Sequence, residues 1–575
     1  MRVILIFILL VLASCNSEVD YKKIHQEQIS QFRGSVENLC SAEMEESALH
    51  NAFFQARTDF KACAFWMEYY YPEAVRKVNG AVLEKVDEHD ANRKTLYPTG
   101  FQVVEEMIFP FHPEDSILLK KKLGELRTFS HALCRQSNYI NFSKPHFFQA
   151  CREQLVSMAA FGLSGFDSPV AKNSWAEMKA TLRGMEVYFR QQKESAPLSE
   201  GIARAVRYLE GADFSPYIFL KQHIIPLERK LNELRIVSGV KALPYNQMLP
   251  DWDHSFAEVS AFNSDYFAPN KKRNTPEAQI KLGEKLFYEN RISGNGERSC
   301  ASCHKPGLAF ASGLKKDRNI QDSGLLERNT PSLNFAAYQA SQFWDGRAGK
   351  LEDQIRRVIE SPVEMNSSLE QAAEVLSDTE EYATDFQLAF ADSGQITPAK
   401  IQNALATFIR SIPVGQSQFD RMLLGLEPEN PAVIAGFNVF MDQGQCGTCH
   451  FFPLFNGTVP PRFSESETEV LGVTAQADFA RPTLDSDSGK FHLHQADLHT
   501  FSFKTPTVRN VALSAPYMHN GAFNNLEQVV DFYDFGGGAG MGLNVPNQTL
   551  PSDSLKLTAQ QKSDLIAFLN ALSGS

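Results

Sequence analysis

Positive charge is scarce relative to negative charge in this chain of 575 residues. Its 56 Lys and Arg are outnumbered by 68 Asp and Glu, which gives a net charge of −12 and an isoelectric point near 5.7. A chain with this balance offers no basic face for nucleic acid, so we expect small molecules or proteins as partners. With 22% charged and 43% hydrophobic residues, the composition is that of a folded protein.

Long apolar runs are missing too, apart from the first 15 residues. The start, MRVILIFILLVLASC, joins one Arg to an apolar run too short for a dependable membrane span and ends on small residues before Cys15, as export signals do. It resembles a bacterial lipoprotein signal with LASC as the lipobox. The resemblance implies a processed signal peptide (1–15), a lipidated Cys15 and a periplasmic, membrane-anchored protein. The alternative is an ordinary secretory signal that ends near a Cys.

Cysteine is sparse, with nine residues in the whole chain. Cys15 belongs to the signal and four lie in two C-x-x-C-H motifs, so Cys40, Cys63, Cys134 and Cys151 remain. Because export leads to an oxidising compartment, the even remainder predicts two disulfides, and the connectivity stays open. Buried free thiols are the alternative.

The length exceeds what one hydrophobic core usually serves, so we expect three domains. Residues 16–250 show apolar residues at helical spacing, as in WAEMKATLRGMEVYFRQQ, and predict a helical bundle. The stretch from Gly100 to Glu105 resembles the GxHxxE region of imelysin-type bundles. Gln102 stands where that family has His, so a helix packing face is favoured over a metal site.

A diverged repeat follows the bundle. From about residue 255 the chain carries more Gly, Asn, Pro and Phe. GEKLFYENRISGNGERSCASCH and the later GFNVFMDQGQCGTCH each place a Gly-x-x-x-Phe helix shortly before C-x-x-C-H. The repeat predicts two similar helical domains, 255–425 and 426–575, in a chain that is all-α throughout.

The two C-x-x-C-H motifs carry the clearest chemistry. In such a motif two thiols add to the vinyl groups of a haem and the adjacent imidazole reaches the iron, so attachment and ligation come from one turn. Zinc knuckles and thioredoxin-like dithiols do not require His directly after the second Cys. The motifs therefore predict two covalently bound c-type haems, one on Cys300, Cys303 and His304 and the other on Cys446, Cys449 and His450.

Longer stretches around these motifs resemble a known family. RNTPSLNFAAYQASQFWDGRAGKLEDQ with SPVEM, and TPTVRNVALSAPYMHNGAF with LEQVVDFY, look like the bacterial dihaem cytochrome c peroxidase and MauG family, from about residue 275 to the C-terminus. The resemblance implies two cytochrome c-like helical domains with a calcium ion between them. It also implies peroxide reduction or, as in MauG, oxidation of a partner protein.

The same resemblance assigns three residues to the reaction. Trp344 in FWDGRA corresponds to a tryptophan between the haems that relays electrons, and Gln354 and Glu364 correspond to the distal pocket of the first haem. Cleavage of a peroxide requires a proton to move from the inner to the outer oxygen. A desolvated Glu can do this as base and then acid.

Histidine is absent from Lys305 through Cys449. Typical peroxidases of the family carry a second His shortly after the first C-x-x-C-H motif, and it blocks the iron until the other haem is reduced. We therefore expect the sixth position of the first haem to be open to peroxide without prior activation, as in MauG. Met365, directly after Glu364, is the alternative ligand.

The second haem departs from the typical pattern as well. Fourteen residues after His519 in PYMHNG stands Tyr533, where typical peroxidases have a Met ligand and MauG has Tyr. A phenolate is a hard, anionic donor that lowers the potential, whereas a thioether raises it. Tyr533 is the expected ligand of the second haem, with Met518 and Met541 as alternatives.

For calcium, the family uses an Asn side chain and two backbone carbonyls at the domain seam. The corresponding residues are Asn329, Ser514 and Pro516. A shell of oxygen atoms suits a hard cation. The alternative for Asn329 is a plain turn residue.

These features predict a dihaem c-type peroxidase that reduces hydrogen peroxide at the His304 haem. Electrons from a small cytochrome c, a quinol or another donor would be relayed through the His450 haem. The alternatives are MauG-like oxidation of a partner protein, and a non-catalytic dihaem electron carrier or redox sensor.

Overall fold

Helices form most of the regular structure, which confirms the all-α class expected from the sequence. The computed structural model describes residues 19–87, 90, 94–190, 193–243, 247–269 and 275–574, so Cys15 lies outside the described residues. Within that part of the chain, the strands form two short antiparallel pairs, β1 (Lys85–Val86) with β2 (Thr95–Leu96) and β3 (Thr468–Val470) with β4 (Ser502–Lys504). No described helix is both long and apolar enough to cross a bilayer.

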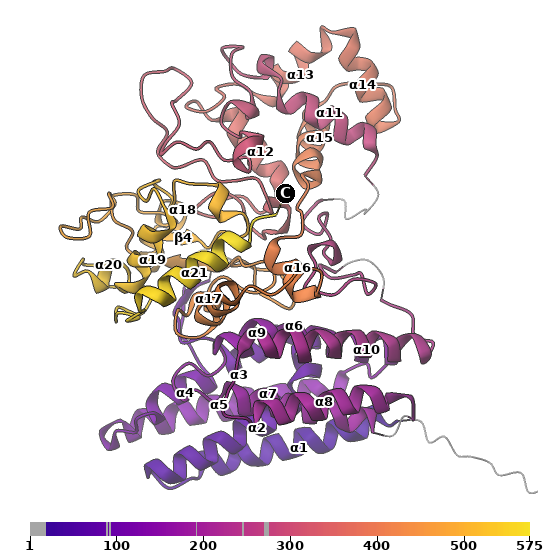
Figure 1. Ribbon diagram of the computed structural model, residues 1–575, viewed down its shortest axis with the longest axis vertical. Coiled ribbons are helices and arrows are strands. Elements are labelled where there is room, and N and C mark those ends of the chain that lie inside the picture. The colour runs from indigo at the N-terminus through magenta and orange to yellow at the C-terminus, as the bar shows by residue number, and fades with distance from the viewer. Residues whose placement is uncertain are drawn as a thin grey trace, which may run out of the picture.

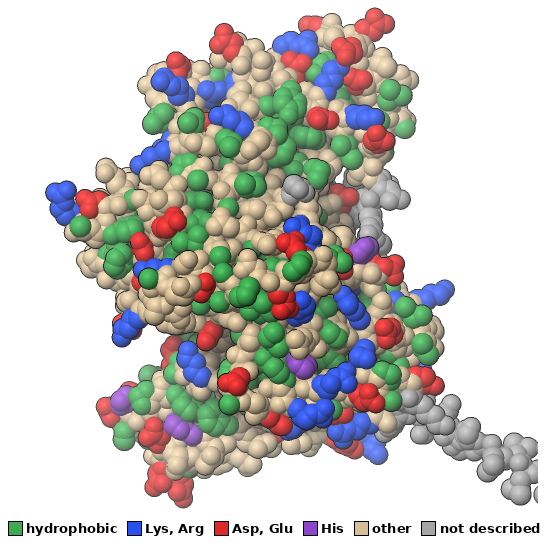
Figure 2. Space-filling view, viewed as in Figure 1, with side chains coloured by type: hydrophobic (Ala, Val, Ile, Leu, Met, Phe, Trp, Pro, Cys, Tyr) green, Lys and Arg blue, Asp and Glu red, His purple; other side chains and the backbone are tan. Residues whose placement is uncertain are grey.

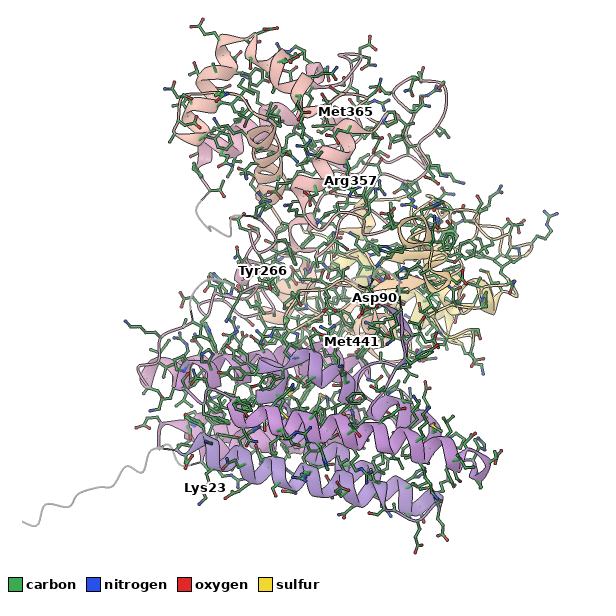
Figure 3. All side chains as sticks on the ribbon, turned by 180° about the vertical axis from the view of Figure 1, so that it is seen from behind. Lys23, Asp90, Tyr266, Arg357, Met365 and Met441 are labelled. Carbon is green, nitrogen blue, oxygen red and sulfur yellow. The ribbon has the colours of Figure 1, made fainter. Side chains whose placement is uncertain are left out.

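Three groups of helices are stacked along the long axis of the molecule (Figure 1). The N-terminal bundle lies at one end, the helices around the first C-x-x-C-H motif lie at the other, and those of the second motif lie between them. On the face shown in Figure 2, acidic and basic side chains are interspersed with apolar ones. Met441, which precedes the second motif, lies close to the bundle, whereas Met365 lies in the far domain (Figure 3).

The bundle forms because each of its longer helices buries an apolar face. Phe32, Phe53 and Phe60 are fully buried, and their rings pack around Phe101. Burial of one such ring stabilises the fold by about 1.5–3 kcal/mol. The bundle helices are α1 (Tyr21–Cys40), α2 (Glu46–Tyr70), α3 (Pro72–Asn79), α4 (Phe101–Ile108), α5 (Ser116–Gln136), α6 (Lys144–Ser157), α7 (Ser174–Phe189), α8 (Ala196–Leu209), α9 (Pro216–Phe219) and α10 (Ile225–Val237).

The region that resembles the imelysin motif lies in α4. Gln102 is buried, and its Nε2 donates to the Phe166 carbonyl at 3.1 Å. Glu105 is buried one turn later and accepts from the Ser168 hydroxyl at 2.9 Å. Both side chains hold the loop after α6 against α4, so the observed contacts are structural.

The two C-x-x-C-H domains repeat one helix crossing. A Cβ on Gly283 would lie 2.0 Å from the Ala404 carbonyl oxygen, and a Cβ on Gly436 would lie 2.0 Å from the Asp564 carbonyl oxygen. Each glycine therefore permits the helix before its motif to cross a later helix closely. The first domain contains α11 (Glu277–Phe287), α12 (Leu351–Glu360), α13 (Leu369–Ser377), α14 (Glu380–Phe390) and α15 (Pro398–Ser411). The second contains α16 (Gln418–Leu424), α17 (Pro431–Met441), α18 (Phe491–His494), α19 (Leu526–Asp534), α20 (Gly537–Gly540) and α21 (Ala559–Ala571).

Helix α16 packs with the second domain although it precedes residue 426. The ring of Phe419 lies 4.9 Å from that of Phe437 and 5.0 Å from that of Phe568. Asp420 and Arg509 form a fully buried ion pair at 2.8 Å. The chain between α15 and α16 is thus where contacts change from one domain to the other.

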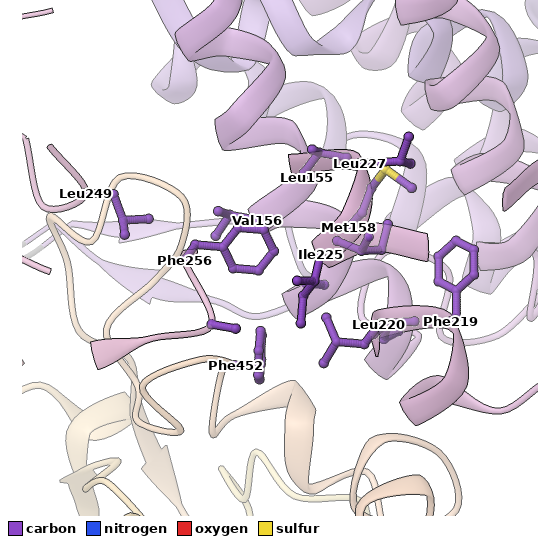
Figure 4. Packing of buried hydrophobic residues seen from close by; sticks show 14 of the residues in the cluster. Leu155, Val156, Met158, Phe219, Leu220, Ile225, Leu227, Leu249, Phe256 and Phe452 are labelled. Carbon is purple, nitrogen blue, oxygen red and sulfur yellow. The ribbon is translucent and has the colours of Figure 1, made fainter. Parts of the chain in front are cut away.

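The bundle and the second domain share one hydrophobic core. Leu155 and Ile225 of the bundle lie in the same buried cluster as Phe256, from the connecting segment, and Phe452 of the second domain (Figure 4). The rings of Phe256 and Phe452 are 6.2 Å apart, edge to face. At the rim, Lys85 of β1 pairs with Glu467 at 3.0 Å. Continuous burial of this kind fixes the bundle against the second domain.

The expected disulfides are not formed, and that prediction was wrong. Cys40, Cys63, Cys134 and Cys151 are all free. Cys151 lies in the core shared with the second domain, whereas Cys63 and Cys134 lie in the separate core of the bundle. The Cys63 thiol donates within its own helix to the Phe60 carbonyl at 3.3 Å. Burial raises the pKa of the Cys134 thiol to about 11, so these groups act as neutral, apolar core side chains.

Candidate functional site

The first motif begins with a short capped turn. Cys300–Ser302 form one 3-10 turn, and Ser299 and Ser302 cap its start reciprocally. The His304 amide then donates to the Cys300 carbonyl at 3.0 Å, which brings the imidazole back over the same turn. Cys300, Cys303 and His304 all line one cavity. The second motif repeats this geometry, with the His450 amide 2.9 Å from the Cys446 carbonyl.

Each motif histidine is fixed in one tautomer. His304 Nδ1 lies 2.8 Å from the Phe310 carbonyl oxygen, and His450 Nδ1 lies 3.0 Å from the Pro506 carbonyl oxygen. Because a carbonyl can only accept, Nδ1 carries the hydrogen and Nε2 keeps its lone pair. Burial lowers the pKa of His304, and that of His450 to about 4, so both imidazoles are neutral. Each can bind iron through Nε2.

The cavity beside His304 has a volume of about 490 Å³, within the range of cofactor sites. Glu364 and Gln354 both line it, and Met365 is in its wall with 3% of its surface exposed. The site thus combines a neutral imidazole, a carboxyl group and an amide around one space.

The Glu364 carboxyl group is held at the edge of this cavity. It is hydrogen-bonded to the Ser361 side chain, and its backbone amide donates to the Ser361 carbonyl at 3.2 Å. Burial raises the pKa of Glu364, and Ser361, Arg347 and Arg298 oppose that shift. A carboxyl group in this balance can change protonation state during a reaction.

The second cavity, of about 280 Å³, lies beside His450. Cys446, Cys449 and Tyr533 line it, and so does Met518. Met541 is not among the described residues that line this cavity, and it packs beside Tyr533 in a small apolar cluster. Burial raises the pKa of the Tyr533 phenol.

Trp344 borders both cavities. Six residues line the two spaces at once, and they are Asn329, Pro331, Leu333, Phe343, Trp344 and Gln354. The indole N–H of Trp344 donates to the Asn329 carbonyl at 2.8 Å, and the Trp344 carbonyl accepts from the Lys504 amide at 2.7 Å. The first domain therefore fixes the indole of Trp344, and the second domain fixes its backbone.

The residues expected to hold calcium lie together at this seam. Asn329, Ser514 and Pro516 all line the second cavity. Asn329 Nδ2 donates to the Leu314 carbonyl at 2.9 Å, which leaves its Oδ1 atom as the acceptor end of the amide. The backbone amide of Asn329 donates across the seam to the His519 carbonyl at 2.7 Å. Oxygen donors at this place fit a hard cation.

One imidazole at the first cavity was missed by the sequence reasoning. His492, on α18 of the second domain, lines the first cavity, is exposed, and has its Nε2 atom 2.9 Å from the Ser488 hydroxyl. Its ligand atoms lie within 4.8 Å of those of Glu327 and Asp487. Asp487 is already paired with Arg328 at 2.6 Å. No local sequence signal pointed to this contact, because His492 is distant in sequence from the first motif.

Two attachment motifs, two neutral imidazoles with available Nε2 atoms, and cavities that meet at one tryptophan define a dihaem c-type cytochrome. A family model for di-haem cytochrome c peroxidase matches residues 277–427. The methylamine utilization protein MauG of Methylorubrum extorquens is 34% identical over 307 residues, which are 53% of this chain and 81% of that protein. The chain therefore belongs to the di-haem cytochrome c peroxidase and MauG family.

Other proteins show the same relationship over about half of the chain. A cytochrome-c peroxidase of Pseudomonas sp. is 31% identical over 326 residues, 53% of this chain and 84% of its own. The crystal structure of a MauG-like protein associated with microbial copper homeostasis is 29% identical, with a TM-score of 0.48, and covers 52% of this chain and 91% of that one. Membership of the family makes the protein an oxidoreductase that uses peroxide and carries two c-type haems.

Proposed function

We propose that the protein reduces hydrogen peroxide at a haem on Cys300, Cys303 and His304. Electrons reach it through a second haem on Cys446, Cys449 and His450. The observation that most directly supports this function is the position of the Glu364 carboxyl group, which lines the cavity of His304 and has its pKa raised by burial. An electron carrier has no use for a half-buried carboxyl group there, so this favours an enzyme over the non-catalytic alternative.

A haem bound at His304 supplies the iron on which the O–O bond of peroxide is broken. Glu364 takes the proton from the inner peroxide oxygen and delivers it to the outer oxygen, which leaves as water. Arg298 and Arg347 favour the ionised carboxylate that starts this transfer, and burial favours the protonated form that completes it. Gln354 orients the peroxide. Over one turnover, one hydrogen peroxide, two protons and two electrons give two molecules of water.

A haem held by Cys300, Cys303 and His304 would leave room beside it for peroxide in this proposal. The stretch from Lys305 through Cys449 contains no imidazole to occupy it. Met365 is buried in the wall, where its carbonyl accepts from the Gly294 amide at 2.8 Å. His492 is exposed and bonded to Ser488, so it belongs to the rim of the cavity. Peroxide would then bind without prior reduction of the other haem.

In the loaded protein Trp344 would pass electrons between the two sites, and Tyr533 would be the residue that holds the second haem together with His450. Tyr533 favours a second candidate function, the MauG-like oxidation of a residue in a partner protein. A phenolate ligand lowers the potential of the second haem and so suits it to hold an oxidising equivalent. The physiological donor is a small cytochrome c, a quinol or another reductant.

The remaining assignments concern the setting of the enzyme. A calcium ion held by Asn329 Oδ1 and the carbonyls of Ser514 and Pro516 would keep the two haem domains in register. The signal and Cys15 would place the protein in the periplasm on a lipid anchor. The proposal keeps three domains with the limits 16–250, 255–425 and 426–575, except that α16 belongs with the second haem domain.

Stopped-flow mixing of the two-haem protein with hydrogen peroxide tests the role of Glu364. We expect Glu364→Gln to slow the reaction by about 10²–10⁴-fold, because a positioned acid–base group contributes on that order. The resting spectra of both haems should stay the same. Glu360→Gln, on the exposed end of α12, is the matched control and should react at the wild-type rate. An unchanged rate in Glu364→Gln would remove Glu364 from the mechanism.

A turnover assay separates the two enzymatic functions. Rapid peroxide consumption with a reduced small cytochrome c or a quinol supports the peroxidase. A long-lived oxidised protein that reacts slowly with these donors supports oxidation of a partner protein.

A further inference from the structure

Lys504 is a buried cation in the wall of the second cavity. It ends β4, only 8% of its surface is exposed, and its Nζ atom donates to the Gln339 side-chain oxygen of the first domain. Among the described residues that line this cavity, Lys504 is the only Lys or Arg. The position is therefore distinct from the arginine-rich wall of the first cavity.

A buried ammonium group needs an anion beside it. Removal of such a group from water is costly unless it is paired, and an amide oxygen carries no net charge. Burial lowers the pKa of Lys504 to about 8, and Asp345 is the acid that opposes this shift. Asp345, however, already accepts from Arg328 at 2.6 Å and from Arg347 at 2.7 Å. Within the described protein, the charge of Lys504 is left largely uncompensated.

The direction of the Lys504 side chain can be read from the strand pairing. In the β3–β4 pair, Lys504 lies opposite Thr468, and Phe503 lies opposite Glu469. Because side chains alternate along a strand, Lys504 and Glu469 leave the ribbon on opposite faces. Glu469 lies beside the attachment cysteines, because its carboxyl group is hydrogen-bonded to the Cys449 thiol. Lys504 instead reaches Gln339.

The covalent chemistry of a c-type haem supplies the missing anion. Two thioether bonds hold the vinyl edge of the ring at Cys446 and Cys449, and the two propionates project from the opposite edge. We propose that Lys504, together with the amide of Gln339, anchors a propionate of the second haem. The proposal rests on the assignment of that haem to Cys446, Cys449 and His450.

The anchor is connected to Trp344 by one backbone hydrogen bond. The Lys504 amide donates to the Trp344 carbonyl at 2.7 Å, so movement of the lysine also moves the indole between the two sites. A positive charge at the propionate edge favours the reduced state of the iron, since reduction adds a negative charge to the haem. Lys504 is thus a positioning residue that raises the potential of the second haem and partly offsets the Tyr533 phenolate.

Spectroelectrochemical titration of the two-haem protein tests this assignment. We expect Lys504→Met to lower the midpoint potential of the second haem by about 59 mV, which is a tenfold change in its ratio of reduced to oxidised forms. The midpoint potential of the first haem should change far less. Lys504→Arg should restore most of the potential. Lys562→Met removes a surface lysine of the same domain, paired with Asp531 at 2.8 Å, and should leave both midpoints in place.

A second variant keeps the test decisive if Lys504→Met does not fold. Gln339→Leu retains the charge and removes the companion amide, and it should shift the same midpoint in the same direction by a smaller amount. Wild-type midpoints in Lys504→Met or in Gln339→Leu, with both haems attached, would overturn the propionate anchor alone. A two-haem wild-type protein that fails to react with peroxide would overturn the proposed function instead, and the midpoint test of the anchor would still apply.

Discussion

Tyr533 faces the second cavity with its phenol buried beside both attachment thiols. Burial raises the pKa of this phenol, so it would stay protonated unless its oxygen bound a strong Lewis acid such as ferric iron. We expect Tyr533→Phe to change the low-spin EPR signal, which belongs to the second haem in our proposal, and to raise the potential of that haem. The high-spin signal of the first haem should persist.

Tyr517 offers a matched control for this ligand test. It lines the same cavity, and its hydroxyl donates to the Val511 carbonyl at 3.2 Å. Tyr517→Phe should leave both EPR signals unchanged. If Tyr533→Phe also left the low-spin signal unchanged, Met518 would become the preferred ligand, since it lines the same cavity.

At the residue scale, the sequence predicts those contacts that form within a single turn of the chain. Each C-x-x-C-H motif contains its own thiols and imidazole, so the groups around His304 and His450 follow from spacing alone. Lys504 and His492 could not be found in this way. Lys504 contacts Gln339 across 165 positions, and His492 reaches the first cavity from the other domain. Such contacts depend on how domains meet, and no local pattern encodes that.

At the scale of single elements, α16 is held by a fully buried ion pair. Asp420 closes the capping box with Ser417 at its start and also accepts two hydrogen bonds from Arg509, at 2.8 and 2.9 Å. We expect Asp420→Ala to lower the free energy of unfolding by about 3–5 kcal/mol, because it leaves a buried guanidinium unpaired. Urea denaturation of the loaded protein measures this loss.

The control is a surface pair between this helix and the residues that follow it. Arg421 pairs with Glu427 at 2.8 Å, and its side chain is 41% exposed. Glu427→Ala should therefore cost about 0–1 kcal/mol. Equal losses in the two variants would show that the Asp420–Arg509 pair contributes no more than a surface pair.

The elements also show which sequence signals are dependable. The Gly-x-x-x-Phe repeat corresponds to one helix crossing in both domains, because only a residue without a side chain fits at Gly283 and Gly436. The even number of remaining cysteines was a poor guide. Cys63 and Cys151 lie in different cores, and buried apolar thiols need no partner. The number of cysteines carries no information on the distances between their thiols.

For the whole molecule, the contact between the bundle and the second domain should depend on pH. Glu153 of α6 lies 3.5 Å from Arg462 of the second domain, and burial raises its pKa from 4.5 to about 7. Between these values the folded protein binds a proton that the unfolded chain has lost. The free energy of unfolding should therefore fall as pH rises from about 4.5 to 7, by an amount on the order of 3 kcal/mol.

Urea titrations at pH 5, 6, 7 and 8 measure this dependence. Glu153→Gln should flatten the decrease, and Glu210→Gln, at an exposed pair with Arg183, should not. A wild-type slope in Glu153→Gln would assign the pH dependence to other groups, such as Glu68, whose pKa burial raises to about 6.

The bundle also covers the second attachment motif. Phe161 and Phe166, which follow α6, place their rings 5.3 and 5.8 Å from that of Phe451, and a Cβ on Gly447 would lie 3.2 Å from Ser164. Around the first motif, Ser302 and Lys305 are exposed. This cover leads us to expect an order of maturation, in which the second haem is attached before the bundle docks on Gly447 and Phe451, whereas the first motif stays accessible afterwards. A chain that closed too early would be trapped with a single cofactor.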